Sequence, residues 1–111
     1  MGEFIFSKSE LDGVTLISPK QFTSENGSFE KNYERIIYES NGILFEITEE
    51  YKLISDKGVL RGIHFQNPEP QSRIISVLMG EALVAVVDLR KDSAQVGKWK
   101  TYRINNQNKI S

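Results

Sequence analysis

Short runs of apolar or alternating residues recur along the chain, with turn-forming residues between them. Runs of this length and spacing are typical of strands in an antiparallel sandwich or barrel, and they differ from the strand and helix alternation of a βαβ fold. The clearest runs lie at residues 14–17, 43–47, 59–66, 73–79, 82–89 and 99–104, with "EFIFS" and "EYKLI" as further candidates. A jelly roll needs about eight strands in two sheets. The pattern therefore predicts an all-β fold, an antiparallel jelly roll.

One segment, "FEKNYERIIYES", has a different period. Its residues Phe29, Tyr33, Ile36 and Ile37 recur at the spacing of one helical face. We expect a short helix near residues 30–38.

Clusters of Gly, Pro, Ser and Asn mark the expected loops, which are "TSENGS" at 23–28, "NPEPQS" at 67–72 and "KDSAQVGK" at 91–98. The turn of Met79, Gly80 and Glu81 is short enough to join two strongly apolar runs. Those two runs are expected to form a central hairpin.

Composition fits one domain spanning residues 1–111, because 111 residues at 39% apolar content can build a single core. There is no cysteine, which excludes disulfides and thiolate zinc sites and suits a reducing cytoplasm. The longest apolar run, 82–87, is far shorter than the ~20 residues of a membrane span. Charged residues also begin too early for a signal peptide. We expect a soluble cytoplasmic protein without membrane contact.

Charge argues against nucleic acid as a partner. Lys and Arg number 14 against 15 Asp and Glu, giving a net charge of −1. No basic run is long enough to track a phosphate backbone.

His64 is the single histidine, and it lies in the apolar run "KGVLRGIHFQ". Strict strand alternation places His64 and Gln66 on one face and Arg61 on the other. A bulge at Gly62 would let His64 and Arg61 line one cavity. The alternative is a hydrogen-bonded strand histidine beside a surface arginine.

Other side chains favour neither a metal nor paired-carboxylate chemistry. Metal sites in small β-barrels generally use two or three imidazoles, and only one is present. Glu49 and Glu50 would project to opposite faces of a strand, as on a solvated edge. We therefore expect no metal and no hydrolytic carboxylate pair.

Four further residues are candidates for a binding or a structural role. Arg73 could clamp an oxyanion, or it could protect a strand edge from aggregation. Asp88 and Arg90 end a strand and are expected to hold the following loop by ion pairing. Trp99 is expected to pack in the core.

Taken together, "GVTLISPKQF", "GVLRGIHFQ" and "RIISVLMGEALVAVVDLRKDSAQVGKW" resemble the dTDP-4-dehydrorhamnose 3,5-epimerase family, from about Gly13 to Lys109. The resemblance implies a cupin-fold isomerase of dTDP-rhamnose biosynthesis, cytoplasmic and without a cofactor. It also implies a homodimer that exchanges N-terminal strands. The implied substrate is a nucleotide-linked 4-keto-6-deoxyhexose.

The resemblance also implies residue roles. His64 corresponds to the base that removes protons beside the C4 ketone. Arg73 occupies the position of the family's enolate-stabilising lysine. Arg61 and Gln66 correspond to contacts with the nucleotide sugar.

The chain departs from the family pattern at several positions. Asn26 replaces a substrate-gripping arginine in the early loop, and Glu49 and Tyr51 stand in the family's "Q-D-N" strand. Val84 replaces an aspartate. We keep Asn26, Glu49 and Tyr51 as candidate substrate contacts. The family's tyrosine acid and its histidine-orienting aspartate correspond to positions beyond Ser111.

Three interpretations remain open. The favoured one is that residues 1–111 form the N-terminal part of a longer epimerase-like protein, with a jelly roll incomplete at its C-terminus. The second is a related ketosugar isomerase with altered chemistry. The third is a degenerate member that binds a nucleotide sugar, or serves as a structural β-domain, without turnover.

Overall fold

The computed structural model describes residues 3–44, 46–65, 71–106 and 109–110. Its elements are β1 (Ile5–Lys8), β2 (Thr15–Ser18), β3 (Lys20–Ser24), β4 (Gly27–Lys31), α1 (Arg35–Ser40), β5 (Ile75–Ser76), β6 (Glu81–Val87), β7 (Trp99–Asn105) and β8 (Lys109–Ile110). Every strand pair among these residues is antiparallel. The predicted antiparallel β class with one short helix is confirmed.

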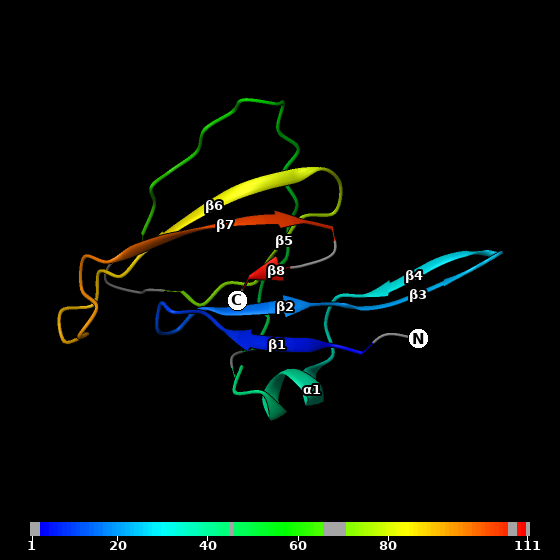
Figure 1. The fold of residues 1–111 in the computed structure, drawn as a ribbon, viewed down its shortest axis with the longest axis horizontal. Coiled ribbons are helices and arrows are strands. Elements are labelled where there is room, and N and C mark those ends of the chain that lie inside the picture. Colours follow the sequence, from blue (N-terminus) through cyan, green and yellow to red (C-terminus); the bar gives the residue numbers. More distant parts are fainter. Residues whose placement is uncertain (1–2, 45, 66–70, 107–108, 111) are drawn as a thin grey trace.

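Four short strands form one sheet in the order β1-β2-β8-β5 (Figure 1). In the β1–β2 hairpin, Phe6 faces Ile17 across the ladder. Ile17 is fully buried, because the inner face of this hairpin lies over α1 and its neighbours. The "EFIFS" run is thus a strand, β1, as expected.

The longest ladder is the β6–β7 hairpin, in which Val84 faces Tyr102 and Ala82 faces Ile104. Tyr102 and Ile104 are buried and pack with Val84, because even-numbered positions of both strands face the core. Trp99 lies on the odd-numbered face and is 70% exposed. The expectation that Trp99 packs in the core is therefore wrong.

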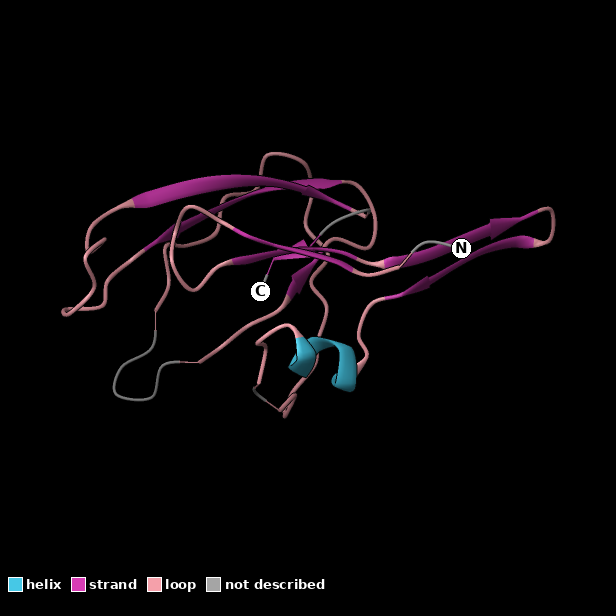
Figure 2. Cartoon of the chain, turned by 60° about the horizontal axis from the view of Figure 1, so that its bottom comes forward, coloured by secondary structure: helices cyan, strands magenta, loops and turns pink. Residues whose placement is uncertain are grey.

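A third hairpin, β3–β4, projects from the body as an arm, and it does so in both views (Figures 1 and 2). Its ladder runs from Lys20↔Lys31 to Ser24↔Gly27. Gly27 has φ +133°, a conformation that favours glycine at the end of such a turn. The loop expected at 23–28 is thus a tight turn within a hairpin.

Helix α1 covers one face of the β1–β2 hairpin (Figure 2). It begins at Arg35, later than the predicted 30–38, because residues 27–31 pair with β3 instead. Tyr38 is fully buried, its ring meeting Phe6 edge-on at a centroid distance of 5.2 Å. The Tyr38 hydroxyl donates to the Asn32 carbonyl at 2.5 Å.

Burial raises the pKa of Tyr38 to about 12, above the ordinary value of 10.0. Tyr38 then ionises at lower pH in the unfolded chain than in the folded chain. The folded state therefore keeps its full stability from neutral Tyr38 below pH 10, and loses stability as pH rises toward 12. In Tyr38→Phe, we expect the unfolding free energy to decrease less over that pH range than in the unaltered chain. Urea unfolding at pH 9 and at pH 11.5 measures it. Tyr51→Phe, at a 67% exposed position, is the matched control, and its unfolding free energy should decrease with pH as much as that of the unaltered chain.

Several predicted strands are missing from the described residues. Residues 43–47, apart from 45, and 59–65 have no strand, and neither does "EYKLI". Each lacks a partner ladder among the described elements, and extended backbone without one is left as coil. The strand expected at 73–79 is reduced to Ile75–Ser76, which pairs with β8 rather than β6. The expected 79–81 hairpin between those strands is wrong.

The coil and the arm make the molecule extended. The radius of gyration is 15.1 Å, against ~13 Å for a compact domain of about this length. The principal extents are 50 × 36 × 26 Å. The helix found in the described part of the chain is far too short to cross a bilayer.

Candidate functional site

The segment that carries the predicted base is an exposed coil. Residues 46–65 run as a loop beyond β6, drawn in green in Figure 1. All of them are exposed, including His64. The expectation of a strand histidine facing an enclosed hollow is wrong for this structure, because no described strand pairs with residues 59–65 and no layer covers the ring.

Gly62 bends this coil beside the imidazole. Its φ of +109° is one that side chains with a Cβ rarely adopt, and a Cβ there would lie 3.6 Å from His64 Nδ1. The backbone therefore departs from extended geometry at Gly62, but in a coil, so the strand bulge considered for Gly62 is not formed.

Arg61 forms hydrogen bonds within its own loop. Its Nε and Nη2 atoms donate to Ser55 Oγ at 3.3 Å and 3.2 Å. The backbone N–H of Val59 donates to the Asp56 carbonyl at 3.3 Å, closing the turn between them. Arg61 is thereby occupied in shaping residues 55–61.

The remaining catalytic candidate is also separate. Arg73 is exposed just before β5. Among the described residues, no hydrogen bond or ion pair joins any two of His64, Arg61 and Arg73. Gln66 lies outside the described residues.

The candidate substrate contacts are dispersed. Asn26 lies at the exposed tip of the β3–β4 arm, where its N–H donates to Ser24 Oγ at 3.2 Å. Glu49 and Tyr51 are exposed in the coil. In Figure 1 the arm tip and the coil lie on different sides of the body. The structure therefore does not bring the predicted site residues together.

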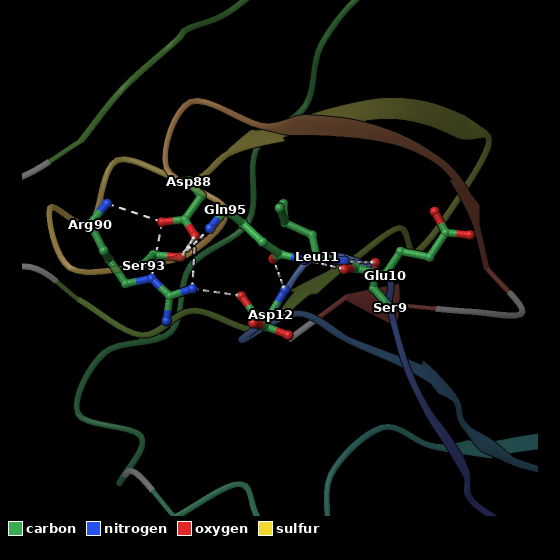
Figure 3. Close-up of polar contacts among 8 residues, drawn as sticks. All are labelled: Ser9, Glu10, Leu11, Asp12, Asp88, Arg90, Ser93 and Gln95. Carbon is green, nitrogen blue, oxygen red and sulfur yellow. Dashed lines mark hydrogen bonds and ion pairs between the residues drawn. The ribbon is translucent and has the colours of Figure 1, made fainter.

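The structure does assemble a polar cluster elsewhere, around Asp88 (Figure 3). The Asp88 side chain is 2% exposed, and its carboxylate accepts from Arg90 Nε at 3.0 Å and Nη2 at 2.9 Å. Ser93 Oγ donates to it at 2.5 Å, and the Arg90 N–H at 3.0 Å. Hydrogen bonds from the Arg90 side chain, then from Ser93 and the Arg90 N–H, hold the pKa of Asp88 well below its ordinary value. The carboxylate therefore stays charged at any physiological pH.

This cluster reaches the β1–β2 loop, more than 75 residues away in sequence. Arg90 Nη2 donates to the Asp12 carbonyl at 3.1 Å. The Gln95 side chain accepts from Asp12 N–H at 2.7 Å and donates to the Glu10 carbonyl at 2.8 Å. We call Asp88, Arg90, Ser93 and Gln95 the clasp.

The sequence predicted part of the clasp. Asp88 and Arg90 were expected to hold the 91–98 loop, and this is confirmed by their hydrogen bonds and the ion pair. Gln95 was missed, as was the short hydrogen bond between Ser9 and Tyr102. Both contacts join residues far apart in the chain, so no local pattern signals them.

A family model and curated relatives point to the same protein family. The family model described as dTDP-4-dehydrorhamnose 3,5-epimerase matches residues 8–111. The epimerase of Methanothermobacter thermautotrophicus is 38% identical over 109 residues, covering 98% of this chain and 59% of the relative.

Solved structures agree. The Bacillus anthracis dTDP-4-dehydrorhamnose 3,5-epimerase, solved with TDP and PPi bound, matches at 26% identity and TM-score 0.87, over 96% of this chain and 63% of that one. The Legionella pneumophila dTDP-6-deoxy-D-glucose-3,5-epimerase, in complex with dTDP-4-keto-L-rhamnose, matches at 27% identity and TM-score 0.80, over 97% and 59%.

The chain thus spans about three fifths of the length of these relatives. Its fold, mostly β with one short helix, matches their cupin fold, as the strand pattern and motifs predicted. Because the family model covers all but the first seven residues, the chain belongs to the dTDP-4-dehydrorhamnose 3,5-epimerase family.

Proposed function

We propose that this protein epimerises a dTDP-linked 4-keto-6-deoxyhexose by removing a proton beside the ketone. The observation that carries the proposal is the family match, which runs through the segment containing the single imidazole, His64. Two relatives of the same fold were solved with TDP or a dTDP-4-keto sugar bound, which supports this substrate class. The proposed compartment is the cytoplasm, which suits a chain without cysteine.

In the proposed reaction His64 accepts the carbon-bound proton. Imidazole suits the step because it gains and loses a proton near neutral pH. The electrons left behind form an enolate, and a fixed guanidinium, Arg73, would stabilise the charge that develops on its oxygen. Arg61 and Gln66 would bind the nucleotide sugar. No cofactor takes part.

Completing inversion needs an acid on the opposite face of the sugar. A base alone removes a proton and returns one to the same face, so it exchanges hydrogen with solvent without changing the stereocentre. We propose that His64 acting as the base supplies solvent exchange, and that inversion also needs an acid on the opposite face of the sugar.

The coil that carries His64 also needs another protein layer packed against it. Residues 46–65 carry exposed apolar side chains, among them Leu53 at 66%, Ile54 at 94% and Leu60 at 93%. Large apolar side chains exposed in this number along one segment favour a contact with another layer. We propose that a homodimer supplies part of it, through exchange of N-terminal strands. The projecting β3–β4 arm supports this, because an isolated two-stranded hairpin is only marginally stable in water.

A second candidate function is binding of a nucleotide sugar without turnover. It is favoured by the exposure of His64 and Arg73, which no described contact joins. It is also consistent with Asn26 at the tip of the arm, an uncharged residue in place of a cation.

Incubation with dTDP-4-keto-6-deoxyglucose in deuterated water tests both functions. Deuterium at C3 or C5, read by mass spectrometry and proton NMR, supports the epimerase. Saturable binding in equilibrium dialysis without deuterium uptake supports the binding protein. If millimolar substrate gives no binding and no deuterium uptake, both functions are contradicted.

A further inference from the structure

The loop between β1 and β2 is gripped by residues of the β6–β7 connection. Gln95 bridges it, donating to the Glu10 carbonyl at 2.8 Å and accepting from the Asp12 N–H at 2.7 Å, while Arg90 donates to the Asp12 carbonyl at 3.1 Å (Figure 3). Leu11, between these contacts, is 4% exposed. The closed end of the β1–β2 hairpin is therefore docked on the β6–β7 hairpin.

All three of these contacts are made to main-chain atoms. The Gln95 carboxamide uses one N–H donor and its oxygen acceptor here, and so pairs with the loop as a peptide group of a neighbouring strand would. The clasp therefore binds the main chain of the loop and does not contact the side chains of Glu10 and Asp12 through these hydrogen bonds. The same loop of a second copy would offer the same atoms.

The connection from β2 to β3 does not by itself decide which copy the hairpin joins. Only Pro19 separates Thr15–Ser18 from Lys20–Ser24, and the chain passes from one strand into the next without a reversing turn (Figure 1). The residue before a proline favours extended backbone, which keeps this ribbon straight. A hairpin at the end of a straight ribbon can pack on its own chain or on a neighbour's, as in domain swapping.

We propose that the clasp is an intramolecular lock that keeps the β1–β2 hairpin on its own chain. Asp88 holds Arg90 and Ser93 in place, and Arg90 and Gln95 hold the hairpin loop. Because the loop is tethered nearby, the clasp of the same chain meets it at a far higher effective concentration than that of another copy. This consequence rests on the proposed homodimer: the lock confines strand exchange between its subunits to the β3–β4 arm.

The test uses a thiol cross-link across the docked loop. Lys100 Nζ lies 3.2 Å from Glu10 Oε2, and neither of these side chains takes part in the clasp hydrogen bonds. The chain has no cysteine, so Glu10→Cys with Lys100→Cys places the only two thiols there. A short bis-maleimide then joins residues 10 and 100, and intact mass shows whether one chain or two are linked.

The lock is opened by Gln95→Glu, which keeps the size of the side chain but loses the donor to Glu10 and sets a carboxylate against that carbonyl. Gln71→Glu makes the same charge change at an exposed position and is the matched control. Gln95→Met, which loses both hydrogen bonds without adding charge, is the second variant should Gln95→Glu not fold, as judged by circular dichroism.

With Gln95 intact or with Gln71→Glu, we expect the product to have the mass of one chain. With Gln95→Glu or Gln95→Met at the same protein concentration, we expect two-chain product to rise about tenfold. Two-chain product dominating while Gln95 is intact overturns the lock, and so does an equal yield in the Gln95 and Gln71 variants. The deuterium assay fails or succeeds independently, because it reads the chemistry at His64 and not the chain to which the hairpin is docked.

Discussion

Replacing His64 by asparagine is expected to lower deuterium uptake into dTDP-4-keto-6-deoxyglucose at least about 100-fold. A positioned general base contributes ~10²- to 10⁴-fold to a proton transfer, and the chain has no second imidazole to take its place. The rate is measured by mass spectrometry of the sugar at constant substrate concentration in deuterated water.

Two controls separate chemistry from folding. His64 is exposed, so His64→Asn should leave the urea midpoint unchanged. Lys57→Asn makes a polar substitution in the same coil, at a turn residue outside the proposed site, and should leave uptake unchanged. Added imidazole should restore part of the uptake in His64→Ala. Undiminished uptake in His64→Asn would show that another group is the base.

Replacing Ile17 by alanine is expected to lower the unfolding free energy by about 2–5 kcal/mol. Ile17 is 0% exposed and lies in the cluster of Tyr38 and Ile43, with Phe6 packed against it. Removing its methyl groups leaves a cavity that the paired β1 and β2 backbones cannot collapse to fill. Since small domains are stable by only ~5–15 kcal/mol, the loss is a large fraction of the total.

Urea unfolding followed by circular dichroism measures this loss. Ile5→Ala on the adjoining strand is the matched control, because Ile5 is 64% exposed, and its effect should stay within about 0.5 kcal/mol. Equal losses at Ile5 and Ile17 would mean that the β1–β2 hairpin is not packed in a common core.

The β6–β7 hairpin shows how far local pattern extends. Residues 82–89 and 99–104 were predicted as strands, and they are found as Glu81–Val87 and Trp99–Asn105. Apolar, β-branched runs favour extended backbone wherever they can pair. Their pairing with each other could not be read from the same pattern, which favoured a hairpin between 73–79 and 82–89 instead.

The coil around His64 shows the opposite case. Residues 59–65 have the alternation of a strand, yet they are coil because no described ladder accepts them. A strand is completed by hydrogen bonds to another segment, so propensity alone cannot make one. The cavity that a bulge at Gly62 would let His64 and Arg61 share depended on that strand, and the described residues 59–65 do not form it.

The sequence by itself determined the family, through motifs such as "GVLRGIHFQ". With the family it determined the fold class and the place of the single imidazole, His64, within that motif. It also indicated the contact of Asp88 with Arg90, since side chains two residues apart lie on the same face of an extended segment. Tertiary structure alone decided that Gln95 grips Asp12, 83 residues away, and that β5 pairs with β8. Such contacts form only when the chain closes long loops, and the cost and outcome of closure depend on every competing pairing at once.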